Sequence, residues 1–289
     1  MIKPKAYILR TAGTNCDEGT QFAFHLAGAD AEIIDIKDLI KGQNPISGRK
    51  FKLSDCQILA IPGGFSNGDY IRSGKIFADD LKHYLENELR DFIESGKLII
   101  GICNGFQVLT NYGLLPGLDG KIEQTVSLTY NQQQRFRCDW VRLSKPMSAK
   151  QCIWTDGIDR LDLPIANGEG KFVADDELLK EMFGKGLVQF QYSDMDYNPV
   201  SLFPYNPNNS MESIAAICNE SRNVFGLMPH PERFIYPKRH RFASLQEILG
   251  RNYVNRDDKF VKEMIRTIGK LPDEGQGLKI FKNGVNYFK

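Results

Sequence analysis

The segment that most constrains the fold is 97–109, where an apolar run ends at a cysteine between two glycines. Residues 98–102 are mostly β-branched and predict a buried strand. Residues 101–105 then have the G-x-C-x-G pattern of a sharp turn from a strand into a helix. The glycines allow a tight turn, and the amino end of a helix stabilises a thiolate. We therefore predict that Cys103 is a nucleophile, although a cysteine that only packs at a strand end would fit this short pattern equally well.

Strands and helices alternate through the first hundred residues. Apolar runs predict strands at 6–10, 31–36 and 56–61, and helical patterns follow at 17–28 and 73–95. Thr14 or Asn15 is the expected cap of the first helix. This alternation predicts an α/β fold with a mostly parallel central sheet and helices on both faces. Ligands of such sheets bind beyond the carboxyl ends of the strands, where Cys103 and the turn Pro62-Gly63-Gly64 lie.

The second half of the chain has a different pattern. Short strand-like segments separated by turn residues occur at 125–128, 136–143, 186–192, 213–218 and 224–228. They predict an antiparallel extension of the sheet. Beyond it we expect an amphipathic helix at 260–268 and a polar, irregular end at 272–289. We divide the chain into a domain at 1–235 and an extension at 236–289.

Composition excludes several classes of function. A formal net charge of +1 with 25% charged residues gives no large field of one sign for nucleic acid or membranes. The chain has no long apolar span and no signal peptide pattern, so we expect a cytoplasmic protein. Its 6 cysteines form no C-x-x-C pair, which argues against a zinc site. Most of them are expected to be reduced and buried.

One of the 4 histidines stands out. His230 follows an apolar run and lies between Pro229 and Pro231, with Glu232 two residues on. Residues i and i+2 of an extended chain project to the same side, so Glu232 can orient the imidazole while its other nitrogen faces a thiol. This is a nucleophile–base–orienter arrangement with Cys103. A strand-end histidine is the alternative for His230 alone; the remaining histidines lie in predicted helices or in a basic run, at 25, 83 and 240.

Backbone amides near Cys103 are the expected oxyanion hole. Acyl transfer develops negative charge on a carbonyl oxygen, and amides aimed at that oxygen stabilise it. The amide of Asn104 is one candidate, and the amide of Gly64 or Phe65 is the other. A plain turn is the alternative for 62–64, and the chain lacks the G-x-x-x-x-G-K-[ST] pattern of a phosphate-binding loop.

Taken together, these motifs resemble the class I glutamine amidotransferase family. Within it, the chain is most similar to glutaminase subunits that serve an ATP-dependent synthetase of purine biosynthesis. The similarity extends over about residues 5–235 and rests on six blocks in the same order: Gly63-Gly64-Phe65-Ser66-x-Gly68-Asp69-Tyr70, Cys103-Asn104-Gly105-Phe106-Gln107, Asn131-x-x-x-Arg135-Phe136, Gly168-Glu169-Gly170, Asn206-Pro207-Asn208 and Gly226-Leu227-Met228-Pro229-His230-Pro231-Glu232-Arg233.

The resemblance implies a flavodoxin-like fold and a glutaminase mechanism. Cys103 would attack the side-chain amide of glutamine and form a thioester, with His230 as base and acid and Glu232 as its orienter. Gln107 matches a position that contacts the substrate. Ammonia would pass to a separate synthetase, which binds ATP and Mg²⁺, and a small accessory subunit would complete the enzyme. This chain would itself hold no cofactor or metal.

The chain departs from the resemblance at two positions and in length. Asn67 and Asn167 stand where a tyrosine and a histidine are expected. The loop at 41–52 and the segment beyond Phe234 are longer than in the compact form, and we expect the latter to pack on the domain or dock the synthetase. A non-catalytic scaffold and a stand-alone cysteine hydrolase of the same fold are the alternative functions. The intact triad disfavours the first, and Asn104 disfavours the second, because such hydrolases often have a histidine directly after the cysteine.

Overall fold

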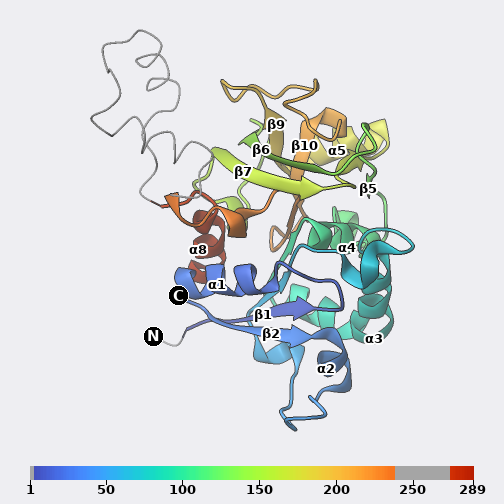
Figure 1. The fold of residues 1–289 in the computed structure, drawn as a ribbon, viewed down its shortest axis with the longest axis vertical. Helices are drawn as coiled ribbons and strands as arrows, with labels where there is room; N and C mark the ends of the chain where they lie inside the picture. Colours follow the sequence, from blue (N-terminus) through green and yellow to red (C-terminus); the bar gives the residue numbers. More distant parts are fainter. Residues whose placement is uncertain (1–2, 238–273) are drawn as a thin grey trace.

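A nine-stranded sheet positions every candidate site residue (Figure 1). The structure is a computed structural model and describes residues 3–237 and 274–289. In sheet order, the strands are β2 (Asp30–Asp35), β1 (Lys5–Arg10), β3 (Ile58–Ile61), β4 (Leu98–Ile102), β11 (Val224–Leu227), β10 (Ile214–Cys218), β9 (Val188–Ser193), β6 (Arg137–Ser144) and β7 (Arg160–Asn167). A separate two-stranded sheet joins β5 (Ser127–Thr129) and β8 (Lys171–Val173).

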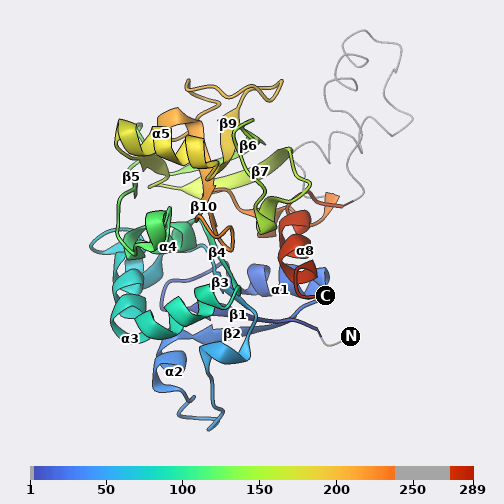
Figure 2. The ribbon, with the colours of Figure 1, turned by 180° about the vertical axis from the view of Figure 1, so that it is seen from behind.

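The five strands from β2 to β11 are parallel. Every residue of β3, β4 and β11 is buried, which explains their nearly continuous apolar sequences. The helices connecting them lie on both faces, with α1 (Asp17–Ala27) opposite α3 (Lys75–Glu94) and α4 (Asn104–Tyr112), as the front and rear views agree (Figure 2). A short helix, α2 (Ile36–Lys41), follows β2. This half confirms the predicted α/β fold.

The strands from β10 to β7 are antiparallel, as predicted for the second half. The β11 and β4 strands pair in parallel with Gly226 opposite Gly101, so their carboxyl ends point the same way. That pairing brings the segment before His230 beside the segment before Cys103. Two elements of this half were not predicted: strand β7 as a whole and helix α5 (Asp176–Lys185).

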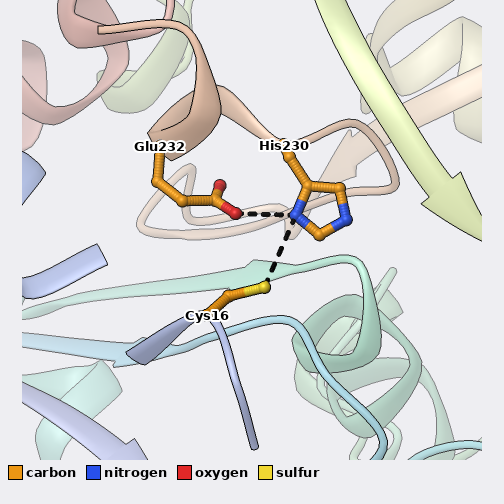
Figure 3. A group of neighbouring side chains, drawn as sticks. All are labelled: Cys16, His230 and Glu232. Atoms are coloured by element: carbon orange, nitrogen blue, oxygen red, sulfur yellow. Dashed lines mark hydrogen bonds and ion pairs between the residues drawn. The ribbon is translucent and has the colours of Figure 1, made fainter. Parts of the chain in front are cut away.

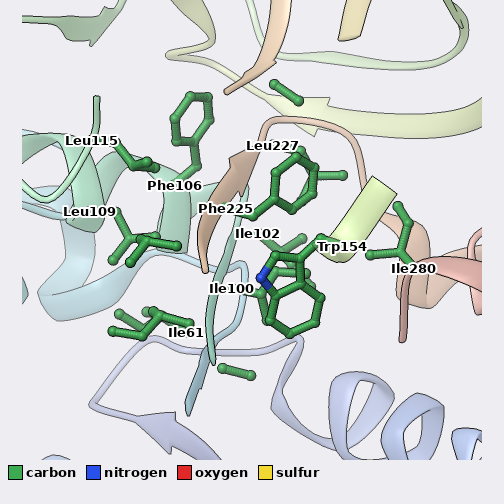
Figure 4. Packing of buried hydrophobic residues seen from close by; sticks show 14 of the residues in the cluster. Ile61, Ile100, Ile102, Phe106, Leu109, Leu115, Trp154, Phe225, Leu227 and Ile280 are labelled. Carbon is green, nitrogen blue, oxygen red and sulfur yellow. The ribbon is translucent and has the colours of Figure 1, made fainter. Parts of the chain in front are cut away.

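The prediction of an irregular end at 272–289 was wrong. Residues Leu278–Asn286 form helix α8, which packs beside α1. Phe281 is fully buried and meets Phe24 of α1 edge to face at 5.0 Å, while Trp154 packs against Gly284. Figure 4 shows Trp154 and Ile280 of α8 among the buried residues. Tertiary packing therefore supplies what the polar composition of this segment does not suggest. The helix expected at 260–268 lies outside the described residues, and the division at 235 stays a prediction.

The predicted cap of the first helix was also wrong. The N-cap of α1 is Cys16, and its side chain makes no capping hydrogen bond. Thr14 Oγ1 instead accepts a hydrogen bond from the amide of Thr11 at 3.2 Å. The local turn thus takes the oxygen that would have capped the helix and leaves Cys16 at its amino end. Among the described helices, none is both long and apolar enough to cross a bilayer.

Candidate active site

Cys103 lies at a sharp turn between β4 and α4. Its φ of 51° and ψ of −104° are unusual for a residue with a side chain, as expected for a nucleophile held at a strained turn. The two glycines are needed for packing: a Cβ on Gly105 would overlap the carbonyl oxygen of Ile61. The Cys103 side chain lies 3.7 Å from the carbonyl oxygen of Ala166 and lines a cavity of about 250 Å³.

His230 and Glu232 form a buried pair at the end of β11. The amide of His230 donates to Pro164 of β7 at 2.8 Å, which fixes the backbone there. Its Nδ1 lies 2.6 Å from Oε1 of Glu232, and both side chains are buried. The other nitrogen, Nε2, is buried without a hydrogen-bond partner among residues 3–237 and 274–289. The imidazole is therefore oriented on one side and available on the other.

The surroundings of Gly63 show that Cys103 and the imidazole of His230 lie close together. A Cβ on Gly63 would lie 2.7 Å from Cε1 of His230 and 3.4 Å from Cβ of Cys103. Burial alone lowers the pKa of His230, but the Glu232 carboxylate and the Cys103 sulfur raise it, and the pKa stands well above its usual range. The structure thus brings together Cys103, His230 and Glu232, which are distant in sequence.

Within the part of the chain that the structure describes, no backbone acceptor competes for the two amides expected to form an oxyanion hole. Asn104 is the first residue of α4, so its amide has no acceptor within the helix. The amide of Phe65 donates to Gly13 at 2.9 Å, whereas none of the described residues accepts from the amide of Gly64. Of the alternatives at this turn, Gly64 is therefore the available donor. It also lines the cavity next to Cys103.

Gln107 lines the same cavity but is already engaged at both ends of its amide. Its Nε2 donates to the carbonyl oxygen of Glu169 at 2.5 Å, and its Oε1 accepts from Asn104 at 2.9 Å. The Asn104 side chain also accepts from the amide of Ser66 at 3.2 Å. Gln107 thus connects the cysteine turn to the backbone of the loop at Glu169 and helps to shape the cavity.

Cys16 is a site residue that the sequence analysis missed. Its sulfur lies 4.0 Å from Nδ1 of His230 and accepts a hydrogen bond from Nη2 of Arg233 at 3.2 Å. Figure 3 shows the sulfur pointing toward the imidazole from the chain segment before α1. Cys16, unlike Cys103, has no motif around it in the sequence, and its partner Arg233 is 217 residues away. The prediction that most cysteines are reduced and buried fits Cys16, and its sulfur also contacts His230 and Arg233.

The two departures from the resemblance have different surroundings. Asn167 is buried beside the cavity, and neither atom of its amide has a hydrogen-bond partner within the described part of the chain. Asn67 adopts a left-handed backbone conformation with a φ of 52° in the loop after Gly64.

The other histidines lie away from this site in the sequence. His25 and His83 lie in α1 and α3, as predicted, whereas residue 240 lies outside the described residues.

Cys16, His230 and Glu232 also have the donor types of a metal site. Their ligand atoms lie within 4.8 Å of one another. However, the guanidinium of Arg233 is already beside both the sulfur and the carboxylate, and its positive charge would oppose a cation there. The charges of this cluster favour the acid–base pair over a metal centre.

Comparisons with known proteins agree with this geometry. A profile described as the CobB/CobQ-like glutamine amidotransferase domain matches residues 3–288. A protein of Methanococcus maripaludis named phosphoribosylformylglycinamidine synthase subunit PurQ is 40% identical and covers 100% of this chain and 99% of its own length. A protein of the same name from Dehalococcoides mccartyi is 39% identical, covering 99% of this chain and 98% of its own.

A solved structure has the same fold. It is described as PurLQS from Thermotoga maritima, and one of its chains is 28% identical to this one, with a TM-score of 0.64 and coverage of 100% of both chains. The fold, the cysteine turn and the histidine–glutamate pair therefore agree with the profile match over nearly the whole chain. The chain belongs to the CobB/CobQ-like glutamine amidotransferase family.

Proposed function

We propose that this chain is the glutaminase subunit of phosphoribosylformylglycinamidine synthase. It hydrolyses glutamine to glutamate and ammonia and delivers the ammonia to an ATP-dependent synthetase subunit of the PurL type. That partner converts formylglycinamide ribonucleotide to the amidine in purine biosynthesis. The observation that carries the proposal is the buried pair of His230 and Glu232, with Nδ1 and Oε1 2.6 Å apart. The imidazole of this pair lies next to Gly63, which is also beside Cys103.

The first chemical step forms a thioester and releases ammonia. His230 takes the proton of the Cys103 thiol, and the sulfur attacks the side-chain carbonyl carbon of glutamine. The amides of Gly64 and Asn104 stabilise the oxyanion. The C–N bond then breaks, and His230 donates a proton to the departing nitrogen. Glu232 holds the imidazole in the orientation for this transfer and stabilises its charged form.

The second step returns the enzyme to its starting state. His230, now neutral, removes a proton from a water molecule, which attacks the thioester carbonyl carbon. The C–S bond breaks, glutamate leaves, and His230 returns the proton to the Cys103 sulfur. The same two amides stabilise the second oxyanion, so no further residue is needed for the chemistry.

The cavity has the charges that an amino acid substrate requires. Asp69, Glu169 and Arg135 line it together with Cys103 and Gln107. The two carboxylates match the α-ammonium group of glutamine, and the guanidinium matches its α-carboxylate. Gln107 shapes the side of the cavity next to Cys103 and would contact the bound substrate or the thioester.

The reaction calls for a closely docked partner. Ammonia exposed to water near neutral pH is protonated, and the ammonium ion is not a nucleophile. An enclosed path to the synthetase prevents this loss. ATP and Mg²⁺ would bind in that subunit and not in this chain, and a small accessory subunit of the PurS type would complete a cytoplasmic enzyme.

A Cys103→Ala variant tests the proposal. In complex with the synthetase, it should lose glutamine-dependent amidine formation by about 10⁴-fold or more, because the nucleophile is absent. The same complex should retain activity with added ammonium chloride, since the synthetase is unchanged. Cys138→Ala is the matched control, because Cys138 is exposed. Glutamine-dependent activity that survives in Cys103→Ala would favour a non-catalytic scaffold or another nucleophile and overturn the proposal.

A further inference from the structure

A second thiol lies on the Glu232 side of the catalytic imidazole. Cys16 is 7% exposed and precedes the first residue of α1. Its sulfur is 4.0 Å from Nδ1 of His230, the nitrogen that Glu232 also approaches (Figure 3). The described lining of the substrate cavity does not include Cys16. The sulfur is therefore placed to influence the histidine without touching glutamine.

Arg233 connects this sulfur to Glu232. Its Nη2 donates to the Cys16 sulfur at 3.2 Å, while its Nε lies 3.6 Å from Oε1 of Glu232. The same carboxylate oxygen lies only 2.6 Å from Nδ1 of His230. One buried carboxylate thus faces two cationic groups, and the shorter contact is with the histidine. The Arg233 side chain is 39% exposed, so it has room to change its position.

Glu232 has a free site that such a movement would fill. Its second oxygen, Oε2, is buried and has no hydrogen-bond partner among the described residues. A guanidinium released from the sulfur could donate to both carboxylate oxygens in the bidentate geometry that arginine prefers. That pairing would compete directly with the bond between Glu232 and His230.

We propose that Cys16 is a positioning residue whose sulfur holds the Arg233 guanidinium, so that the Glu232 carboxylate stays committed to His230. This role rests on the proposed function, because it acts through the catalytic imidazole. It assigns Cys16 no covalent chemistry.

The groups that face His230 define the expected pH behaviour. Glu232 and Arg233 belong to its own turn, Cys103 comes from the β4–α4 turn, and Cys16 comes from the start of α1. Strand β7 contributes the carbonyl oxygen of Pro164, which accepts a hydrogen bond from the amide of His230. The charged residues of β7 have other partners: Asp162 pairs with Arg142 at 3.5 Å, and Arg160 stacks on Tyr197. A carboxylate drawn toward Arg233 would stabilise the imidazolium less, which lowers the pKa of His230.

Cys16→Ala removes the acceptor, and Cys16→Ser keeps a smaller one. In complex with the synthetase, Cys16→Ala should lower the kcat for glutamine hydrolysis by about tenfold and change KM by less than about twofold. The alkaline limb of its pH profile should move to lower pH by about 0.5–1 unit. Cys16→Ser should recover most of the kcat and the profile, because a hydroxyl also accepts from arginine and serine is well tolerated at an N-cap.

A double variant tests whether Arg233 is the cause. Adding Arg233→Met to Cys16→Ala removes the competing guanidinium, so the double variant should be several-fold more active than Cys16→Ala alone. A structural role for Cys16 predicts the opposite, since losing a second buried contact would add to the damage. Unfolding curves of all variants show whether the loss of activity follows a loss of stability.

Alkylation of Cys103 by iodoacetamide, followed peptide by peptide with mass spectrometry, provides a readout that does not require turnover. The pH dependence of this alkylation should differ between the wild type and Cys16→Ala. Cys16→Ser should restore the wild-type pH dependence. An unchanged pH profile and unchanged alkylation in Cys16→Ala would overturn the inference. If Cys103→Ala is inactive in that same series, the proposed function still stands; activity in Cys103→Ala would instead overturn the proposed function.

Discussion

The two sides of the His230 imidazole differ in their partners. On one side lie Cys103, the backbone amides of Gly64 and Asn104, and a cavity lined with charged groups. On the other side lie Glu232, Cys16 and Arg233, which hold one another by hydrogen bonds and charge. The first side is open to a substrate, and the second is filled by the protein. From this comparison we expect the two buried cysteines next to one histidine to have different roles.

Glu232→Gln removes the negative charge on the filled side and should have the largest effect on glutamine hydrolysis among these variants. The amide keeps the size of the carboxylate but loses the charge that stabilises the imidazolium. Glutamine hydrolysis by the complex should fall by about 10³–10⁴-fold, as when the orienting acid of a catalytic triad is neutralised. Activity with added ammonium should persist. Glu177→Gln, at an exposed position of α5, is the matched control, and equal activity of the two variants would show that Glu232 does not orient His230.

Phe281→Ala tests whether the packing of helix α8 supports the turn that contains Glu232. Helix α8 begins next to the turn that contains Glu232, where the amide of Gly277 donates to Phe234 at 2.9 Å. Removing the fully buried ring of Phe281 should lower the free energy of unfolding by about 3–5 kcal/mol, measured by denaturant titration. Lys279→Ala, on the exposed face of α8, should change it little. Equal stability of the two variants would contradict the packing of α8 on the core.

Gly63→Ala disturbs the boundary between the two sides. The new Cβ would lie 2.7 Å from Cε1 of His230, so the ring must move away from its present position. A displacement of this size should cost about 10²-fold in kcat. Gly184→Ala in α5, where a Cβ meets no atom within 4 Å, is the matched control. Full activity of Gly63→Ala would mean that the imidazole position is not critical.

The pH dependence of stability should have the sign that the raised pKa of His230 requires. The folded protein binds this proton more tightly than the unfolded chain, so the stabilisation is complete below the ordinary pKa of 6.5. It is lost as pH rises through the higher pKa of the folded state. The free energy of unfolding of the wild type should therefore decline above pH 6.5 more steeply than that of His230→Gln. Parallel curves would contradict the shift.

The sequence was sufficient to predict the parallel half of the sheet and the meeting of Cys103 with His230 and Glu232. Strands β3 and β4 are continuous apolar runs, and the glycines around Cys103 have a recognisable spacing. His230 and Glu232 share a short motif, so their pairing depends only on local geometry. These features needed no knowledge of distant contacts.

The missed features depend on such contacts. Strand β7 contains charged residues, and one of them, Asp162, is buried through its contact with Arg142 from the neighbouring strand. Helix α8 is short and contains a glycine, and α1 and Trp154 provide the surfaces that bury its apolar side. Cys16 acquires its contacts with His230 and Arg233 from residues more than 200 positions later.

Trapping the reaction intermediate tests the central claim most directly. The complex with the synthetase is incubated with glutamine, quenched in acid during turnover and digested, and each cysteine peptide is weighed by mass spectrometry. We expect a glutamyl adduct on the peptide that contains Cys103 and none on the peptide that contains Cys16. A glutamyl adduct on Cys16, or turnover of glutamine with no adduct on Cys103 under conditions that preserve thioesters, would contradict it.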